Sequence, residues 1–194
     1  LNANVGLIEQ LPFVKLPSFV IRNAELVIAD SKDDWDSYET SWSFAKLMML
    51  NPDSFALSRI VATYIEQCRH IAEEQRQRAI KNNELVADAY GVRDEVPCDV
   101  PIERVSLKRH PAFASPKNTP AERDELMTRD IVKEIISYAV GCMFGRYSLD
   151  KPGLILASQG ETLADYHAQI PDPSFEPDSD NVIPVTEDEW FEDD

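Results

Sequence analysis

The chain has 194 residues, 43% of them hydrophobic and 28% charged, which fits one globular domain or one domain with an appendage. The formal net charge is −16, and residues 152–194 contribute twelve Asp or Glu and no Lys or Arg. The overall composition therefore offers no excess of basic residues for a phosphate-binding groove. This argues against direct DNA binding by most of the chain.

The first 36 residues predict an extended segment followed by a helix. Residues 1–20 carry Pro12 and Pro17 between short apolar runs, which indicates extended backbone. A helix is expected from about Arg22 to Asp36. The carboxylates clustered around its C-terminal end have hard-cation chemistry but lack the glycine and spacing of a calcium loop, so we expect a solvated helix end. These carboxylates are Asp33, Asp34, Asp36 and Glu39.

A long helix is predicted over residues 53–90, which contain neither Gly nor Pro. Asn51 and Pro52 form a helix-start signal, and Gly91 stands where a C-terminal cap is expected. The alternative is two helices broken near 81–83. A heptad-spaced stripe along this helix becomes polar at Gln75, Arg78 and Asn82. We interpret this polar stretch as helix surface that leaves the core and meets solvent; a functional face is the alternative.

Residues 92–118 are rich in proline and predict loops, with a short strand at 104–107. Thr119 to Glu122 form a capping box, which predicts a helix ending near Gly145. Its apolar part is too short to span a membrane. Gly141 and Gly145 are expected to admit a close neighbour, and Arg146 to face outward or to pair at the helix terminus. A small helix is expected at 161–168.

Catalytic and cofactor motifs are missing from the sequence. The six glycines include no GxG pair, the three histidines lie far apart, and no GxSxG is present. We therefore assign no catalytic, cofactor-binding or metal-ligating residue. Three cysteines without a CxxC indicate buried thiols in a reducing compartment, and no signal peptide is recognised, so a cytoplasmic location without membrane attachment is expected.

Two surface features remain as candidate contacts. Residues 101–151 hold the only positively balanced region, and we hypothesise DNA-phosphate contact there; surface solubility and pairing with acids is the alternative. The candidates are Lys108, Arg109, Arg146 and Lys151. The run 187–194 carries Trp190 and Phe191 among carboxylates, and we expect these rings to dock onto another domain, with an acidic interaction patch as the alternative.

Several stretches carry a family resemblance along the whole chain. They are VGLIEQLPF (5–13), DDWDSYETSWSF (33–44), KNNELVADAYGVRDEV (81–96), ISYAVGCMFGRYSLDKPGLILASQGETLADY (136–166) and NVIPVTEDEWFEDD (181–194). In this order they resemble the adenine-specific DNA methyltransferases of BREX phage-defence systems, the PglX/BrxX family. The resemblance implies transfer of a methyl group from S-adenosylmethionine to the N6 of adenine by the parent enzyme.

The same resemblance places this chain after the methyltransferase core, because the family's catalytic Asn-Pro-Pro-Tyr has no counterpart here. It implies a mainly α, spacer-type domain with long helices, short strands and an acidic, Pro-rich tail. We expect residues 1–20 to leave the catalytic domain, 21–170 to form the helical domain and 171–194 to be a linker. The expected role is positioning the parent enzyme on duplex DNA; the alternative is a protein-interaction module that binds other BREX proteins.

Overall fold

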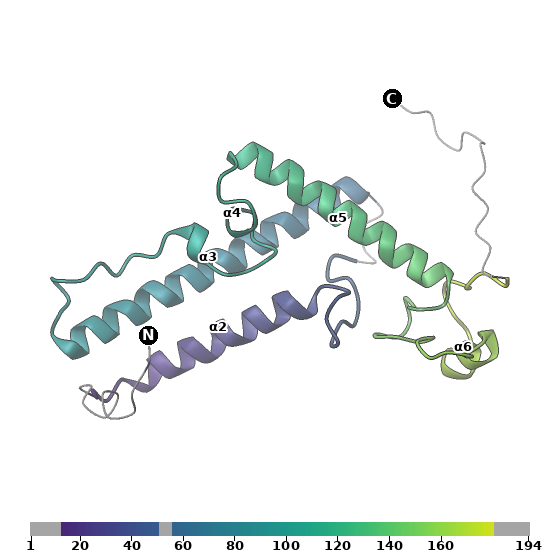
Figure 1. Ribbon diagram of the computed structural model, residues 1–194, viewed down its shortest axis with the longest axis horizontal. Coiled ribbons are helices and arrows are strands. Elements are labelled where there is room, and N and C mark those ends of the chain that lie inside the picture. The colour runs from purple at the N-terminus through teal and green to yellow at the C-terminus, as the bar shows by residue number, and fades with distance from the viewer. Residues whose placement is uncertain (1–12, 51–55, 181–194) are drawn as a thin grey trace. The chain divides into compact units, whose positions relative to one another are not determined.

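The computed structural model describes residues 13–50 and 56–180, and within these ranges the backbone forms helices and no strand (Figure 1). The prediction of a mainly α chain is confirmed. The chain divides into two compact units. Unit 1 comprises Leu1–Trp35 and Ala62–Met127, and unit 2 comprises Asp36–Val61 and Thr128–Asp194. The predicted division at residues 20 and 170 stays a prediction.

Helix α2 spans Ser18–Asp36, so it begins four residues before the predicted start at Arg22. The first turn forms directly after Pro17, whose carbonyl accepts the N–H of Val20 at 3.0 Å. Proline is common at the start of a helix because the first turn does not use its backbone N–H groups as donors within the helix. Val20 and Asn23 are the buried residues of α2.

Helix α3 spans Leu57–Tyr90 without interruption, so the alternative of a break near 81–83 is wrong. Its predicted start signal at residues 51–54 lies outside the described ranges. The predicted C-terminal cap at Gly91 is confirmed, since this residue has φ +68°. The N–H of Val92 donates to Ala87 O at 2.9 Å and that of Gly91 to Asp88 O at 3.1 Å, as in a Schellman motif.

The proline-rich connection after α3 contains the 3₁₀ helix η1 (Ile102–Arg104) and the short helix α4 (Pro111–Ala114). The predicted strand over 104–107 is therefore wrong. The backbone forms short turns instead: the N–H of Val105 donates to Ile102 O, and the N–H of Leu107 donates to Val105 O. Val105 and Leu107 are buried against Ala72 of α3 without a partner strand.

Helix α5 spans Pro120–Met143 and begins with the predicted capping box. The N–H of Thr119 donates to the Glu122 carboxylate at 2.7 Å, and the N–H of Glu122 donates to Thr119 Oγ1 at 3.4 Å. The N–H and the hydroxyl of Thr119 both donate to the Glu122 carboxylate, and these two bonds lower the pKa of Glu122. At the other end Gly145 takes φ +69°, and the N–H of Arg146 donates to Gly141 O at 2.8 Å.

The last described helix is α6, Leu163–Gln169, close to the predicted 161–168. A capping box that the sequence analysis did not single out starts it: the N–H of Thr162 donates to Asp165 at 2.7 Å, which lowers the pKa of that carboxyl. Among the helices of residues 13–50 and 56–180, none combines the length and apolar character needed to cross a bilayer.

Candidate functional site

A polar seam joins α2 to α3 in unit 1. Its residues are Asn23, Asp30, Ser31, Gln75, Arg78 and Asn82. Asn23 Nδ2 donates to Asn82 Oδ1 at 2.9 Å, and Asn82 Nδ2 donates to the backbone carbonyl of Val20 at 3.1 Å. Asn23 is only 4% exposed, so this amide pair is shielded from water. Buried amides that satisfy one another fix the register of two helices.

The other half of the polar seam uses one glutamine and one ion pair. Gln75 Nε2 donates to Val27 O at 3.2 Å and to Ser31 Oγ at 3.1 Å, while its Oε1 is buried without a hydrogen-bond partner. Arg78 pairs with Asp30 at 2.6 Å. The expectation that this part of the long helix meets solvent is wrong, because α2 presents its own polar side chains to it.

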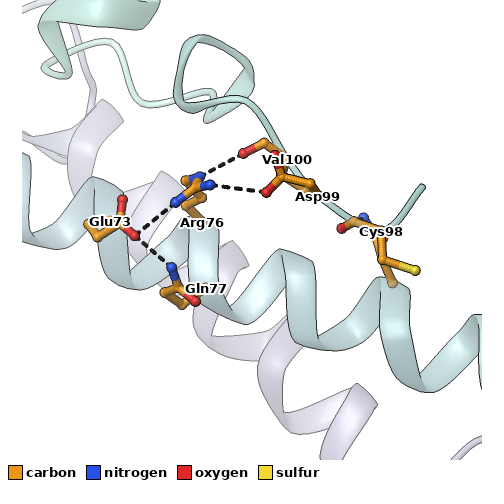
Figure 2. A network of polar contacts seen from close by, with 7 residues as sticks. Glu73, Arg76, Gln77, Cys98, Asp99 and Val100 are labelled. Carbon is orange, nitrogen blue, oxygen red and sulfur yellow. Dashed lines mark hydrogen bonds and ion pairs between the residues drawn. The ribbon is translucent and has the colours of Figure 1, made fainter.

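The loop from 98 to 100 lies along α3 and is held by side chains of that helix (Figure 2). Arg76 Nε donates to Val100 O at 2.7 Å, and its Nη2 pairs with Asp99 at 3.0 Å. Seven residues further along α3, Asn83 Nδ2 donates to Cys98 O at 3.2 Å. Two side chains seven residues apart on α3 therefore donate hydrogen bonds to two backbone carbonyls of this loop.

The Arg76 contact is itself supported from within α3. Glu73 accepts from Arg76 Nη1 at 3.1 Å and from Gln77 Nε2 at 2.6 Å (Figure 2). Both bonds lower the pKa of Glu73, the Gln77 bond most. The sequence did not predict this network. Any residue can supply a backbone carbonyl to an arginine, so such a contact has no characteristic residue pattern.

The predicted carboxylate cluster separates into different roles. Asp34 accepts the backbone N–H of Lys108 at 2.7 Å and of Arg109 at 3.0 Å, which fastens that loop to the end of α2. Asp36, in unit 2, accepts from Ser41 Oγ at 2.6 Å. The solvated helix end is thus confirmed only for Asp33, which is exposed. No group of three or more potential metal ligands occurs among the residues that the structure describes.

Two of the four predicted phosphate contacts lie in unit 1. Lys108 is exposed, whereas Arg109 is buried with its guanidinium carbon 5.5 Å from the centre of the Tyr64 ring. The next residue, His110, is also buried, and its Nδ1 has no hydrogen-bond partner. Burial, and then the charge of Arg123, lower the pKa of this histidine.

The other two predicted contacts lie in unit 2. Arg146 is exposed, as expected, and its guanidinium carbon lies 5.5 Å from the centre of the Tyr147 ring. Lys151 is exposed and its Nζ donates to Gln169 Oε1 at 2.7 Å. Since the four cations are divided between two units, DNA contact by all of them as one surface stays a prediction.

An aromatic core forms the centre of unit 2. The Tyr138 and Tyr147 rings stack with centroids 5.1 Å apart, and Phe44 meets both edge-on. A Cβ at Gly141 would lie 2.5 Å from Cδ2 of Tyr147, so the expected close neighbour of this glycine is a ring from the following loop. Burial raises the pKa of Tyr138 to about 12.

The titratable groups around this aromatic core have the properties of structural residues and not of catalytic ones. Glu39 accepts from Ser137 Oγ at 3.3 Å and from the Tyr147 hydroxyl at 3.5 Å. Burial raises the pKa of the free thiol of Cys142, so this cysteine stays protonated at neutral pH. Cys68 is likewise buried, but Cys98 is only half-buried, so the expectation of buried thiols holds for two of three.

No protein-family model matches the chain. Two curated relatives match it along its whole length. The adenine-specific methyltransferase BrxX of Escherichia coli O9:H4 (strain HS) is 30% identical over 201 residues. The adenine-specific methyltransferase PglX of Lacticaseibacillus casei (strain Zhang) is 31% identical over 200 residues.

All of the chain takes part in both matches, but it spans only 16% of the first relative and 15% of the second. The predicted resemblance is thereby confirmed: over its whole length the chain is similar to one segment of the adenine-specific methyltransferases BrxX and PglX.

Proposed function

We propose that the chain is a non-catalytic helical region of a site-specific adenine-N6 DNA methyltransferase of a BREX phage-defence system. Its role is to position the methyltransferase part relative to the DNA-recognition part. The observation that carries this proposal is the full-length match to two adenine-specific methyltransferases by a sequence without the catalytic Asn-Pro-Pro-Tyr. S-adenosylmethionine and duplex DNA are bound by the parent enzyme, in the cytoplasm, and other BREX proteins are candidate partners.

The internal geometry supports a positioning role. The 34 residues of α3 make a rod of about 50 Å at the standard rise of an α-helix. The polar seam fixes α2 on this rod in one register, and Arg76 with Asn83 fixes the loop from 98 to 100 on it. An element that sets a distance between two other parts needs this kind of defined length and attachment.

A variant of the polar seam in the parent enzyme tests positioning. Asn82→Ala removes two hydrogen bonds that hold α2. We expect kcat/KM for DNA methylation to fall several-fold while the Kd for S-adenosylmethionine is unchanged, because the cofactor site lies elsewhere. Glu95→Ala, an exposed change after α3, serves as the control. Parallel loss of cofactor affinity and activity would show that this segment helps to form the catalytic site.

DNA contact is the second part of the proposal and rests on the exposed cations Lys108, Arg146 and Lys151. Replacing each by Ala in the parent enzyme should weaken duplex binding and reduce the slope of log K against log salt by about one per lost phosphate contact. Arg109 is buried over Tyr64, so Arg109→Ala is expected to lower stability. An unchanged salt slope in all three exposed variants would remove DNA contact from the proposal.

A further inference from the structure

Two loops of unit 2 form one surface. The N–H of Gly153 donates to Ala45 O at 2.7 Å, and the N–H of Ile155 donates to Arg146 O at 2.9 Å. These bonds hold the loop after α5 against itself and against the loop that follows α2. We call the surface formed by residues 42–48 and 144–154 the docking face.

Large apolar side chains stand out from the docking face. Trp42 is fully exposed, and Met48, Leu149 and Leu154 are each more than half exposed. The loop that carries Trp42 is not loose, since the N–H of Ser41 donates to Tyr38 O and that of Phe44 to Ser41 O, and the Phe44 ring is buried. Large apolar side chains held outward by ordered loops are typical of a contact surface.

The docking face also carries a net positive charge, whereas the rest of unit 2 is net negative. Lys46, Arg146 and Lys151 are exposed on it. Asp150 is its one acidic residue, and this carboxylate already accepts the N–H of Ser174 at 2.8 Å. A complementary occupant therefore has negative charge together with large apolar side chains.

Residues 181–194 have this composition. The sequence NVIPVTEDEWFEDD holds six carboxylates, no Lys or Arg, and Val182, Ile183, Trp190 and Phe191. The chain just before this segment is attached next to the docking face: the N–H of Asp178 donates to the carbonyl of Met143, at the end of α5, at 2.8 Å. Fourteen residues reach up to roughly 45 Å when extended. Covalent attachment also gives an effective concentration of the order of millimolar.

From this complementarity we infer that the docking face binds residues 181–194 of the same chain. In this contact Trp42, Leu149 and Leu154 meet the apolar side chains of that segment, and Lys46, Arg146 and Lys151 pair with its carboxylates. The inference does not depend on the proposed positioning role, because it concerns a contact within this chain alone. It competes with the DNA contact proposed for Arg146 and Lys151, because a side chain that pairs with a carboxylate of this segment is not free to bind a phosphate.

Zero-length carbodiimide cross-linking of the intact 194-residue chain tests this contact, since it joins only a lysine amine and a carboxylate that touch. Peptide mass spectrometry should find Lys46 and Lys151 linked to carboxylates within 187–194. Lys117 is exposed but belongs to unit 1, so it serves as the internal control and should give no such link. A mixture of isotope-labelled and unlabelled chains separates links within a chain from links between chains.

The variant that removes the apolar anchor is Trp42→Ala, which should reduce the cross-link yield by about ten-fold, the loss expected for an interfacial tryptophan. Trp35→Ala is the matched control, because Trp35 is also exposed but lies in unit 1, and it should leave the yield unchanged. The inference is overturned if no link to 187–194 forms, if Lys117 links equally well, if Trp42→Ala has no effect, or if the links join different chains.

Discussion

Units 1 and 2 hold their helices in opposite ways. In unit 1, α2 meets α3 through the polar seam, with amide hydrogen bonds and the Arg78–Asp30 pair. In unit 2, the centre holds three aromatic rings in contact, and one of them, Tyr147, packs over Gly141. The comparison separates two requirements of a spacer: a polar seam selects one register, whereas buried rings stabilise the fold by removing apolar area from water.

Different energetic consequences follow for the two units. A buried hydrogen bond adds only about 1 kcal/mol net, but leaving its partner unpaired costs about 1–3 kcal/mol. A buried aromatic ring contributes through the area it removes from water and through ring–ring contact. Substitutions in unit 2 should therefore have the largest effects, and those in unit 1 should depend on which polar atom loses its partner.

The largest effect is expected for Tyr147→Ala in unit 2. This side chain is only 2% exposed and contacts Tyr138, Phe44 and Gly141. Its removal should lower the free energy of unfolding by about 3–5 kcal/mol, measured by urea denaturation. Phe175→Ala, at a partly exposed ring, is the control and should cost much less. Equal losses from both changes would show that the aromatic core is not the main source of stability.

Gly141→Ala should destabilise by about 1–3 kcal/mol, because the new methyl group would overlap the Tyr147 ring. The sign is informative, since Gly→Ala inside a helix ordinarily stabilises by up to about 1 kcal/mol. Urea denaturation of the double variant with Tyr147→Ala provides the check. There Gly141→Ala should become neutral or stabilising, and a persistent loss would mean that something other than this ring opposes the methyl group.

Two substitutions in the polar seam should differ although both remove an amide. Asn82→Ala leaves the Asn23 amide and the Val20 carbonyl unpaired and should cost about 1–3 kcal/mol. Gln75→Met loses the two bonds donated by Gln75 Nε2, but it also removes the buried, unpaired Oε1, and Val27 O keeps the bond that it accepts from Ser31 Oγ at 2.8 Å, so this change should cost less than Asn82→Ala. Amide hydrogen exchange of α2 measures both. A larger opening of α2 in Gln75→Met than in Asn82→Ala would contradict this assignment.

The smallest effect is a pH dependence in unit 1. His110 is buried near Arg123, Arg69, Glu103 and Glu73, and burial lowers its pKa below the usual 6.5. Below that value the unfolded chain binds a proton that the folded chain does not, so stability should fall as pH decreases. Urea midpoints at about pH 7.5 and about pH 5.5 measure the slope. His110→Gln should flatten it, and an unchanged slope would assign the effect to other groups.

Helix ends were the features best predicted from sequence, because their signals are local. Gly91, Gly145 and the Thr119 capping box each act through neighbouring backbone groups, and all three were confirmed. The uninterrupted length of α3 followed from the absence of Gly and Pro between 57 and 90. No equivalent local signal marked the short turns between 101 and 107, where a strand was wrongly expected.

The polar seam could not be predicted, because polar residues on a helix ordinarily indicate solvent. Gln75 and Asn82 gain partners only when α2 presents Ser31 and Asn23 to them. Conversely, three large apolar residues of α2 are exposed: Ile21, Ile28 and Trp35. The candidate phosphate contacts show the same limit, since nothing near Arg109 in the sequence indicates its burial over Tyr64.

The proposed function makes its sharpest claim about cofactor binding, and titration calorimetry tests it directly. S-adenosylmethionine is titrated into the purified 194-residue chain, with the parent enzyme as the positive control. We predict no saturable heat for the chain and a normal isotherm for the parent, because the residues of this segment position the catalytic part without forming its cofactor site. Saturable binding of S-adenosylmethionine by the chain alone would contradict the proposal that this region is non-catalytic.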